Sequence, residues 1–155
     1  MLLKGLLLLP VKLATKEDLS SLIPLVKEFI NSYLPGASFS EEVTLETLEA
    51  IVRNPVETAC ILIWETEGTP SGILIGVIAP RPFSEEVDSV ELCFFVSPSA
   101  RKSEAGKKLF DTYEYWAEYI AKVDYINASC IDEKVSVLFK RKKYSPAEYL
   151  FRKKV

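Results

Sequence analysis

Apolar residues recur along the first half of the chain with two spacings, which predict helices and strands in turn. After the threonine cap and acidic first turn of Thr15–Asp18, apolar residues return every three or four positions up to Pro35-Gly36, as on one face of a helix. A second, short helix is expected over 45–52, before Asn54-Pro55. The apolar runs 59–64 and 73–79, separated by the turn-rich residues 66–72, predict an antiparallel hairpin.

The second half of the chain alternates between the two spacings. It predicts a strand over 87–96, a helix over 105–122, a strand over 125–131, a helix over 132–142 and a last strand over 148–153. The opening MLLKGLLLLP is expected to be a buried strand that continues into 11–14, because Lys4 and Gly5 interrupt the apolar run and no signal-peptide cleavage site follows. This order predicts an α/β (α+β) fold over a single domain, 1–155, with a mixed sheet covered by helices on both faces.

The composition excludes several kinds of site. The 155 residues include no histidine, which removes a histidine general base, a Ser-His-Asp triad and most zinc sites, and no metal is expected. The three cysteines lie in apolar, strand-like runs, which favours a reducing compartment such as the cytoplasm. A net charge of −3 gives no general attraction to nucleic acid or to an anionic membrane, so neither is expected as a partner.

The stretch 90–110 joins an apolar strand to a helix through a loop flanked by basic residues. These are Arg101, Lys102, Lys107 and Lys108. The first N–H groups of a helix have no partner within it, and together with the helix dipole they favour an anion such as a pyrophosphate. Taken alone, this pattern does not distinguish an anion site from an ordinary basic helix start.

Three segments of the chain resemble the GNAT superfamily of acyl-CoA N-acyltransferases. The run VSPSARKSEAG (96–106) resembles the superfamily's V-x-P-x-x-R-x-x-G-x-G loop, and VKLATKEDL (11–19) resembles its first strand and helix. The run DEKVSVLFKRKKY (132–144) resembles its late N-x-x-A-x-x-L-Y-x-x-x-G-[FY] segment. Residues 79–84, 91–92 and 114–117 are similar to a subgroup found in bacteriophage and bacterial genomes. The resemblance implies a GNAT-like central mixed, mostly antiparallel sheet with helices on both faces.

The resemblance also implies a reaction and a set of site residues. An amine would attack acetyl-CoA directly, with Glu91 as the base and a backbone N–H near Phe95 or Val96 as the donor to the oxyanion. Phe139 stands where the superfamily carries the tyrosine that protonates the thiolate. The residues expected to hold acetyl-CoA are Phe94, Phe95, Val96, Arg101, Lys102, Ser103, Glu104, Ala105, Gly106, Lys107, Asp132 and Phe139.

Several positions depart from the superfamily pattern. Phe139 cannot donate a proton, so water or a hydroxyl of Tyr144, Tyr149 or Ser129 would have to replace the tyrosine. Glu104 takes the place of the first loop glycine, Lys143 that of the glycine before the final aromatic residue, and Asp132 that of an asparagine. These departures leave an alternative function open: a catalytically degenerate GNAT-fold protein that serves as a binding module or as a phage structural or host-interaction module.

Three further expectations follow with alternatives attached. Glu91 is either a base whose pKa is raised by apolar neighbours or an exposed acid near a strand end. The loops 33–44 and 80–88 carry five acids, which either attract a cationic amine of a small molecule or a protein or are solvated loop charges: Glu41, Glu42, Glu85, Glu86 and Asp88. The apolar first ten residues suggest a possible homodimer, and the location would be the host cytoplasm for a phage-encoded protein.

Overall fold

The computed structural model describes residues 10–34, 36–130, 133–148 and 151–155. They form a five-stranded sheet in the order β1-β2-β3-β4-β5. The strands are β1 (Val11–Leu13), β2 (Ala59–Thr66), β3 (Thr69–Pro80), β4 (Val87–Val96) and β5 (Tyr125–Ile126). All neighbours are antiparallel except β4 and β5, which run parallel. The α/β class and the mixed, mostly antiparallel sheet expected from the sequence are confirmed.

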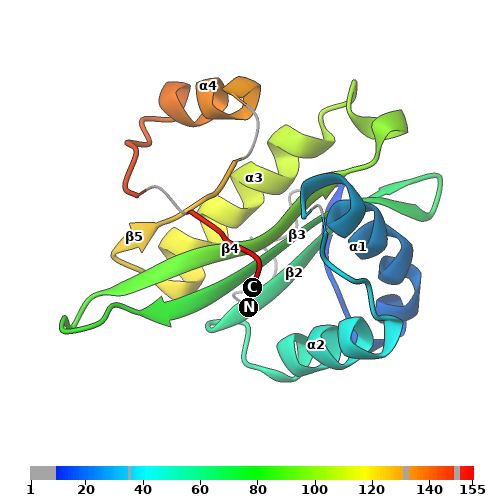
Figure 1. The fold of residues 1–155 in the computed structure, drawn as a ribbon, viewed down its shortest axis with the longest axis horizontal. Coiled ribbons are helices and arrows are strands. Elements are labelled where there is room, and N and C mark those ends of the chain that lie inside the picture. Colours follow the sequence, from blue (N-terminus) through cyan, green and yellow to red (C-terminus); the bar gives the residue numbers. More distant parts are fainter. Residues whose placement is uncertain (1–9, 35, 131–132, 149–150) are drawn as a thin grey trace.

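Helices cover both faces of the sheet (Figure 1). On one face lie α1 (Leu19–Tyr33) and α2 (Glu41–Arg53); on the other lie α3 (Ala105–Tyr115), which continues as the π-helical turn η4 (Trp116–Ala121), and α4 (Glu133–Arg141). The short 3-10 turns η2 (Lys16–Asp18) and η3 (Pro98–Ala100) precede α1 and α3. Each face closes a separate apolar core, because alternate residues of a strand point to opposite sides of a sheet.

The second helix begins four residues before the position expected from its apolar spacing. Ser40 caps α2, its hydroxyl accepting a hydrogen bond from the Val43 N–H at 3.3 Å. Glu41 and Glu42 then occupy the first turn, where carboxylates favour the positive end of the helix dipole. This polar start carries no apolar periodicity, which is why the spacing alone placed the boundary too late.

Two predictions about the strands are wrong, one on where a turn lies and one on whether a strand forms. The β2–β3 hairpin turns at Glu67-Gly68, both with positive φ (51° and 77°), so the strands run through most of the expected 66–72 turn. No strand is present in the described residues of 148–153, where Phe151 is 91% exposed. Phe151 is followed by three charged residues and lies outside both cores, so the described part of this segment covers no apolar surface.

The strand expected over 1–10 falls on residues 1–9, which are outside the described ranges, and Pro10 is a turn residue. The proposed dimer contact through that segment lies outside them too. In the described parts of the chain, none of the helices is both long enough and apolar enough to cross a membrane.

Candidate active site at the split between β4 and β5

The two edges of β4 are paired very differently. Toward β3, the strand is paired along its whole length, from Val87 to Val96. Toward β5 only Asp88 and Ser89 are paired, and the last main-chain hydrogen bond runs from Asn127 N to Ser89 O at 3.0 Å. Figure 1 shows the chain then continuing from β5 toward α4. The predicted strand over 125–131 is therefore cut short at Ile126, and the β4 edge beyond Ser89 is left without a paired strand among the described residues.

A β-bulge at Leu92 marks the start of this open edge. Glu91 is paired with Gly76 and Cys93 with Ile75, so Leu92 has no opposite residue on β3. The extra residue moves the following side chains to the other face of the sheet. Cys93 belongs to the core under α1 and α2, whereas Glu91 lies on the α3 side, opposite a glycine whose Cβ would meet Tyr113.

Glu91 is buried, with only 9% of its surface exposed. Its Oε2 accepts hydrogen bonds from both the main-chain N–H and the hydroxyl of Ser129, each at 3.2 Å. Burial raises the pKa of the Glu91 carboxyl to about 7, and the two Ser129 donors oppose that rise. The interpretation of Glu91 as an exposed acid at a strand end is thus wrong. Its role as the base remains a prediction.

A hydroxyl cluster lies beside Glu91 at the base of the split. The Tyr113 hydroxyl lies 2.9 Å from both Ser89 Oγ and the Asn127 main-chain oxygen. Burial raises the pKa of Tyr113, and the Glu91 carboxylate raises it further, so the tyrosine stays neutral near neutral pH. The cluster links α3 to the last paired residues of β4 and β5.

The main chain of β4 presents alternate residues to its open edge. Ser97 N donates to Ser71 O at 2.9 Å, so the main-chain N–H of Ser97 points toward β3. By the alternation of an antiparallel ladder, the N–H of Phe95 also faces β3, and those of Phe94 and Val96 face the open edge. Of the two N–H groups expected to donate to the oxyanion, that of Phe95 is therefore turned toward β3, and only that of Val96 points to the open edge.

The start of α3 lies next to this edge and is only partly capped. Ser103 Oγ accepts from Ala105 N at 3.1 Å and donates to Ala100 O at 2.6 Å. In the described part of the chain, no acceptor is present for the N–H groups of Gly106 and Lys107. A Cβ at Gly106 would lie 3.9 Å from the side chains of Phe94 and Val96, so the start of α3 packs loosely beside the end of β4.

Glu104 does not close the start of α3. It occupies the N-cap position with φ −76° and ψ 1°, a conformation that any residue tolerates. Its exposed side chain makes no capping hydrogen bond to the helix. Glutamate in place of the superfamily's glycine therefore leaves the main-chain donors available and adds one negative charge nearby.

The basic residues of the loop are partly engaged. Arg101 Nε donates to Val96 O at 3.0 Å, and its guanidinium lies 5.6 Å from the centre of the Phe95 ring. Lys107 forms an ion pair with Asp111, one turn along α3, at 2.8 Å. Lys102 is exposed. Of these three basic residues, Arg101 is thus held to the end of β4 and Lys107 to α3.

Phe139 lies in the core instead of in an open site. It is 7% exposed, and its ring centre lies 5.2 Å from that of Phe110 and 5.6 Å from that of Tyr144. The Phe94 ring joins the same cluster, 5.8 Å from Phe110. Phe139 therefore helps dock α4 against α3, and the structure shows no chemical role for it.

The hydroxyls that were expected to replace the missing tyrosine differ in their partners. Tyr144 donates to Glu114 Oε1 at 3.0 Å, which ties it to α3. Ser129 is exposed and contacts Glu91. Tyr149 and Asp132 lie outside the described residues. Of the two described hydroxyls, Ser129 is the one in contact with the candidate base, a role that its sequence context did not single out.

Lys143 adopts the conformation that the superfamily glycine favours. Its φ is 67°, and the N–H of the following Tyr144 donates to Phe139 O at 2.9 Å, which ends α4 with a left-handed residue. A positive φ is sterically unfavourable for lysine, because of its Cβ, and is not unfavourable for glycine. The departure from the pattern thus weakens the helix end without changing its shape.

The acids of the β3–β4 loop are not a free acidic rim. Arg81 forms ion pairs at 3.0 Å with both Glu86 and Asp88, and its guanidinium lies 4.0 Å from the centre of the Tyr125 ring. Two of the five acids considered for attracting a cationic amine are therefore matched within the loop.

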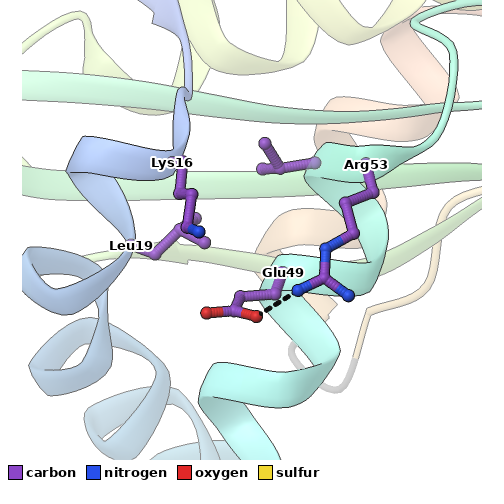
Figure 2. Close-up of a pocket in the computed structure, with 5 residues that line it drawn as sticks. Lys16, Leu19, Glu49 and Arg53 are labelled. Carbon is purple, nitrogen blue, oxygen red and sulfur yellow. Dashed lines mark hydrogen bonds and ion pairs between the residues drawn. The ribbon is translucent and has the colours of Figure 1, made fainter.

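Two surface hollows lie elsewhere. One of about 80 Å³ is lined by Lys16, Leu19, Glu49, Val52 and Arg53; Figure 2 shows the Glu49–Arg53 ion pair on α2 opposite Lys16. The other, about 190 Å³, lies between α2 and the β1–β2 edge. Neither includes a residue of β4 or of the α3 start. Across the described residues, no cluster of acids and cysteines is arranged to hold a metal ion.

Comparisons with known proteins match this architecture in structure but not in sequence. No protein-family model and no curated protein sequence matches the chain. Among solved structures, an aminoglycoside antibiotic 6'-N-acetyltransferase from Acinetobacter haemolyticus superposes with a TM-score of 0.71 at 17% identity, over 95% of this chain and 99% of that one. The chain has the GNAT fold.

Other GNAT-fold neighbours differ in the acceptors that they are named for. A ribosomal-protein-alanine N-acetyltransferase from Brucella melitensis biovar Abortus 2308 matches with a TM-score of 0.67 at 16% identity, over 93% of this chain and 99% of that one. The acetyltransferase AAC(6')-Iy, bound to a bisubstrate analogue of CoA and acetylneamine, matches with a TM-score of 0.73 at 16% identity, over 94% and 97%. At these identities the likeness establishes the fold.

Proposed function

We propose that this protein is an N-acetyltransferase that transfers the acetyl group of acetyl-CoA to a primary amine. The observation that carries the proposal is the open edge of β4, which begins at a buried carboxylate and faces uncapped N–H groups at the start of α3. The GNAT-fold neighbours are acetyltransferases by name, and one of them holds a CoA conjugate.

The residues of the open edge fit an acyl-CoA in two places. The N–H groups of Gly106 and Lys107, with the α3 dipole behind them, suit the diphosphate. The outward-facing main chain of Phe94 and Val96 suits an extended chain that adds to the sheet edge. The contact of Gly106 with Phe94 and Val96, whose side-chain atoms would lie 3.9 Å from a Cβ there, puts the two places next to each other, as one extended ligand requires.

The reaction would proceed by direct attack of the amine on the thioester carbon. As the N–C bond forms, the ammonium proton passes to Glu91, whose pKa of about 7 suits a base that works near neutral pH. The Val96 N–H would donate to the oxyanion, and the C–S bond then breaks to release the thiolate. Phe139 has no proton to give, so the thiolate takes its proton from water or from a hydroxyl.

The acceptor class is the least constrained part of the proposal. The named neighbours act on an aminoglycoside and on a ribosomal protein, so the GNAT fold accommodates both a small molecule and a protein amine. The Arg81 ion pairs reduce the negative charge at the β3–β4 loop. We therefore propose an amine acceptor without assigning it to either class.

One observation favours the alternative, a catalytically degenerate GNAT-fold protein that serves as a binding or phage structural or host-interaction module. Phe139 packs in an aromatic core. The tyrosine that the superfamily carries at this position would instead need to reach the sulfur of acetyl-CoA. A protein that had lost turnover would tolerate such a change.

Thermal unfolding with acetyl-CoA, followed by an assay of thiol release, separates the two functions. Acetyl-CoA at about 100 times its Kd should stabilise the protein by about 2.7 kcal/mol. Amine-dependent release of CoA from a panel of amines and peptide N-termini then supports the enzyme. Binding without release at any amine supports the binding module, and no stabilisation at millimolar acetyl-CoA overturns the proposed function.

A further inference from the structure

The hydrogen bond between Ser129 and Glu91 occupies a position that belongs to the β4–β5 ladder. Parallel strands bond every second residue, and the last regular bond runs from Asn127 N to Ser89 O. Two residues further along both strands, the same ladder would join Ser129 N to the main-chain oxygen of Glu91. In the structure, Ser129 N donates instead to the side-chain Oε2 of Glu91, at 3.2 Å.

The carboxylate therefore stands between the two main chains at the place where a direct bond would hold them together. Ser129 adds a second donor, its hydroxyl, to the same oxygen at 3.2 Å. Ser129 thus reaches the Glu91 side chain and not its main chain, and the Leu92 bulge begins at the next residue of β4. Two independent features thus end the ladder at one point.

We propose that the Glu91 carboxylate, held by Ser129, is the spacer that keeps the residues after β5 away from β4 and so opens the edge that an acyl-CoA would enter. Ser129 is a positioning residue in this arrangement. Its main-chain N–H donates a hydrogen bond to Glu91 Oε2, and its hydroxyl donates a second one that orients the carboxylate. The proposal gives Glu91 a structural task that is separate from proton transfer. The spacer proposal depends on the proposed function in one respect only, which is that the ligand entering the opening is an acyl-CoA.

Variants at position 91 separate the spacer from the base. Glu91→Gln keeps the side-chain length and an oxygen acceptor, so the strands should stay apart while proton transfer is lost. Glu91→Ala removes the spacer, so Ser129 N should bond to the main-chain oxygen at position 91 and extend the ladder. Glu91→Asp, shorter by one methylene, should give an intermediate separation and serves if the alanine variant does not fold.

Amide NMR of the full chain without any ligand tests the spacer directly. In Glu91→Ala we expect cross-strand nuclear Overhauser effects between the backbone protons of positions 91 and 129. We also expect Ser129 N–H exchange at least 10-fold slower than in the wild type. Glu91→Gln should show neither change. An alanine or aspartate variant with the wild-type pattern at Ser129 would overturn the proposal.

A second arm measures the Kd of acetyl-CoA for the same variants. Glu91→Gln should bind within about 3-fold of the wild type, whereas Glu91→Ala should bind at least 10-fold more weakly. Equal Kd values for the two variants would contradict the spacer's effect on the opening. If the wild type binds no acetyl-CoA, the proposed function fails, but the ligand-free NMR result still decides the spacer.

Variants at position 129 test the positioning role. Ser129→Ala keeps the N–H and loses the hydroxyl, so the strands should remain apart while the pKa of Glu91, followed by the carboxyl ¹³C shift, rises. Ser129→Thr should restore the wild-type titration. A Glu91 titration unchanged in Ser129→Ala would show that the hydroxyl does not orient the carboxylate, and would remove Ser129 from this role.

Discussion

The two edges of β4 show how one strand combines a rigid frame with an opening. On the β3 side, Val87–Val96 is paired throughout and is interrupted only by the bulge at Leu92. On the β5 side, two residue pairs suffice before the strands part at Glu91. The paired edge ties β4 to β3, and both strands contribute side chains to the cores on the two faces, whereas the open edge begins at a buried carboxylate and presents main-chain donors. Stability and the proposed chemistry thus lie on opposite sides of the same strand.

The difference shows that one bulge can keep β4 paired with β3 and at the same time place a carboxylate where β4 and β5 separate. By shifting the register against β3, the extra residue at position 92 turns Glu91 toward α3 while Cys93 and Phe95 stay in the opposite core. A regular strand would have pointed all three side chains to one face. The predictions below test the open edge against the paired edge.

The largest effect is expected from removing the candidate base on the open edge. Glu91→Gln should lower the rate of acetyl transfer by about 10²–10⁴-fold, because the amide cannot take the ammonium proton. Steady-state CoA release with a responsive amine measures it. The wild-type kcat/KM should also fall below about pH 7, as Glu91 becomes protonated. An undiminished rate in the variant would remove Glu91 from the reaction.

The buried carboxylate should also make stability depend on pH. The pKa of Glu91 rises on folding from an ordinary 4.5 to about 7, so the folded state binds the proton more tightly than the unfolded state. Stability is therefore lost as pH rises from 4.5 through 7, by roughly 3 kcal/mol for this group. Urea unfolding of the wild type and Glu91→Gln between pH 5 and pH 8 measures the difference.

Two titratable neighbours of Glu91 do not change their charge between pH 5 and pH 8. Burial raises the pKa of the Cys93 thiol and of the Tyr113 hydroxyl, so both stay neutral throughout this range. The wild type should lose stability relative to Glu91→Gln as the pH rises. Parallel pH profiles for the two proteins would mean that the carboxyl titrates normally in the fold.

On the paired edge, a single methyl group should be costly. A Cβ at Gly76 would lie 2.7 Å from Tyr113 Cε2 and 3.0 Å from Trp116, both fully buried. Gly76→Ala should therefore destabilise the protein by about 1–3 kcal/mol. Gly106→Ala is the matched control, because its Cβ would meet nothing within 3.9 Å: it should leave stability unchanged or raised while weakening acetyl-CoA binding. Equal destabilisation by the two variants would contradict the contrast between the edges.

The end of α4 offers a gain in stability. Lys143→Gly should stabilise the protein by about 1 kcal/mol, because glycine adopts the positive φ of this position without steric cost. Val137→Gly, in the middle of the helix and 46% exposed, should instead destabilise it by roughly 0.5 kcal/mol. Thermal unfolding of both variants decides; a loss of stability on Lys143→Gly would rule out strain at this residue.

The smallest effect is expected at the α3 start. Glu104→Gln removes a negative charge next to the uncapped N–H groups, so the Kd for acetyl-CoA should fall about 2–5-fold, and more at low salt. Glu28→Gln, an exposed residue of α1, is the charge-matched control and should leave the Kd unchanged. Calorimetric titration at two salt concentrations distinguishes these outcomes.

Much of the fold could be predicted from local sequence patterns. The order of elements up to α4 and the placement of Glu91 in an apolar strand followed from periodicity and capping residues, which act within a few positions of the chain. The resemblance to the GNAT superfamily then pointed to residues 91–107 as the site.

The features that shape the candidate site could not be predicted in the same way. The Leu92 bulge depends on the register against β3, and the Ser129–Glu91 contact joins residues 38 positions apart. The 148–153 prediction failed in its described residues for a related reason: Phe151 suits a strand, but a strand also needs a core to cover, and Phe151 is exposed. Phe139 and Lys143 were identified as departures, and only their surroundings showed that one packs in the core and the other ends a helix.

The most direct test of the account is an amide NMR titration of the ¹⁵N-labelled full chain with acetyl-CoA. The account predicts saturable shifts that are concentrated at Phe94, Val96 and residues 104–107, along the open edge and the start of α3. Absence of shifts at millimolar acetyl-CoA, or shifts confined to other parts of the molecule, would contradict it.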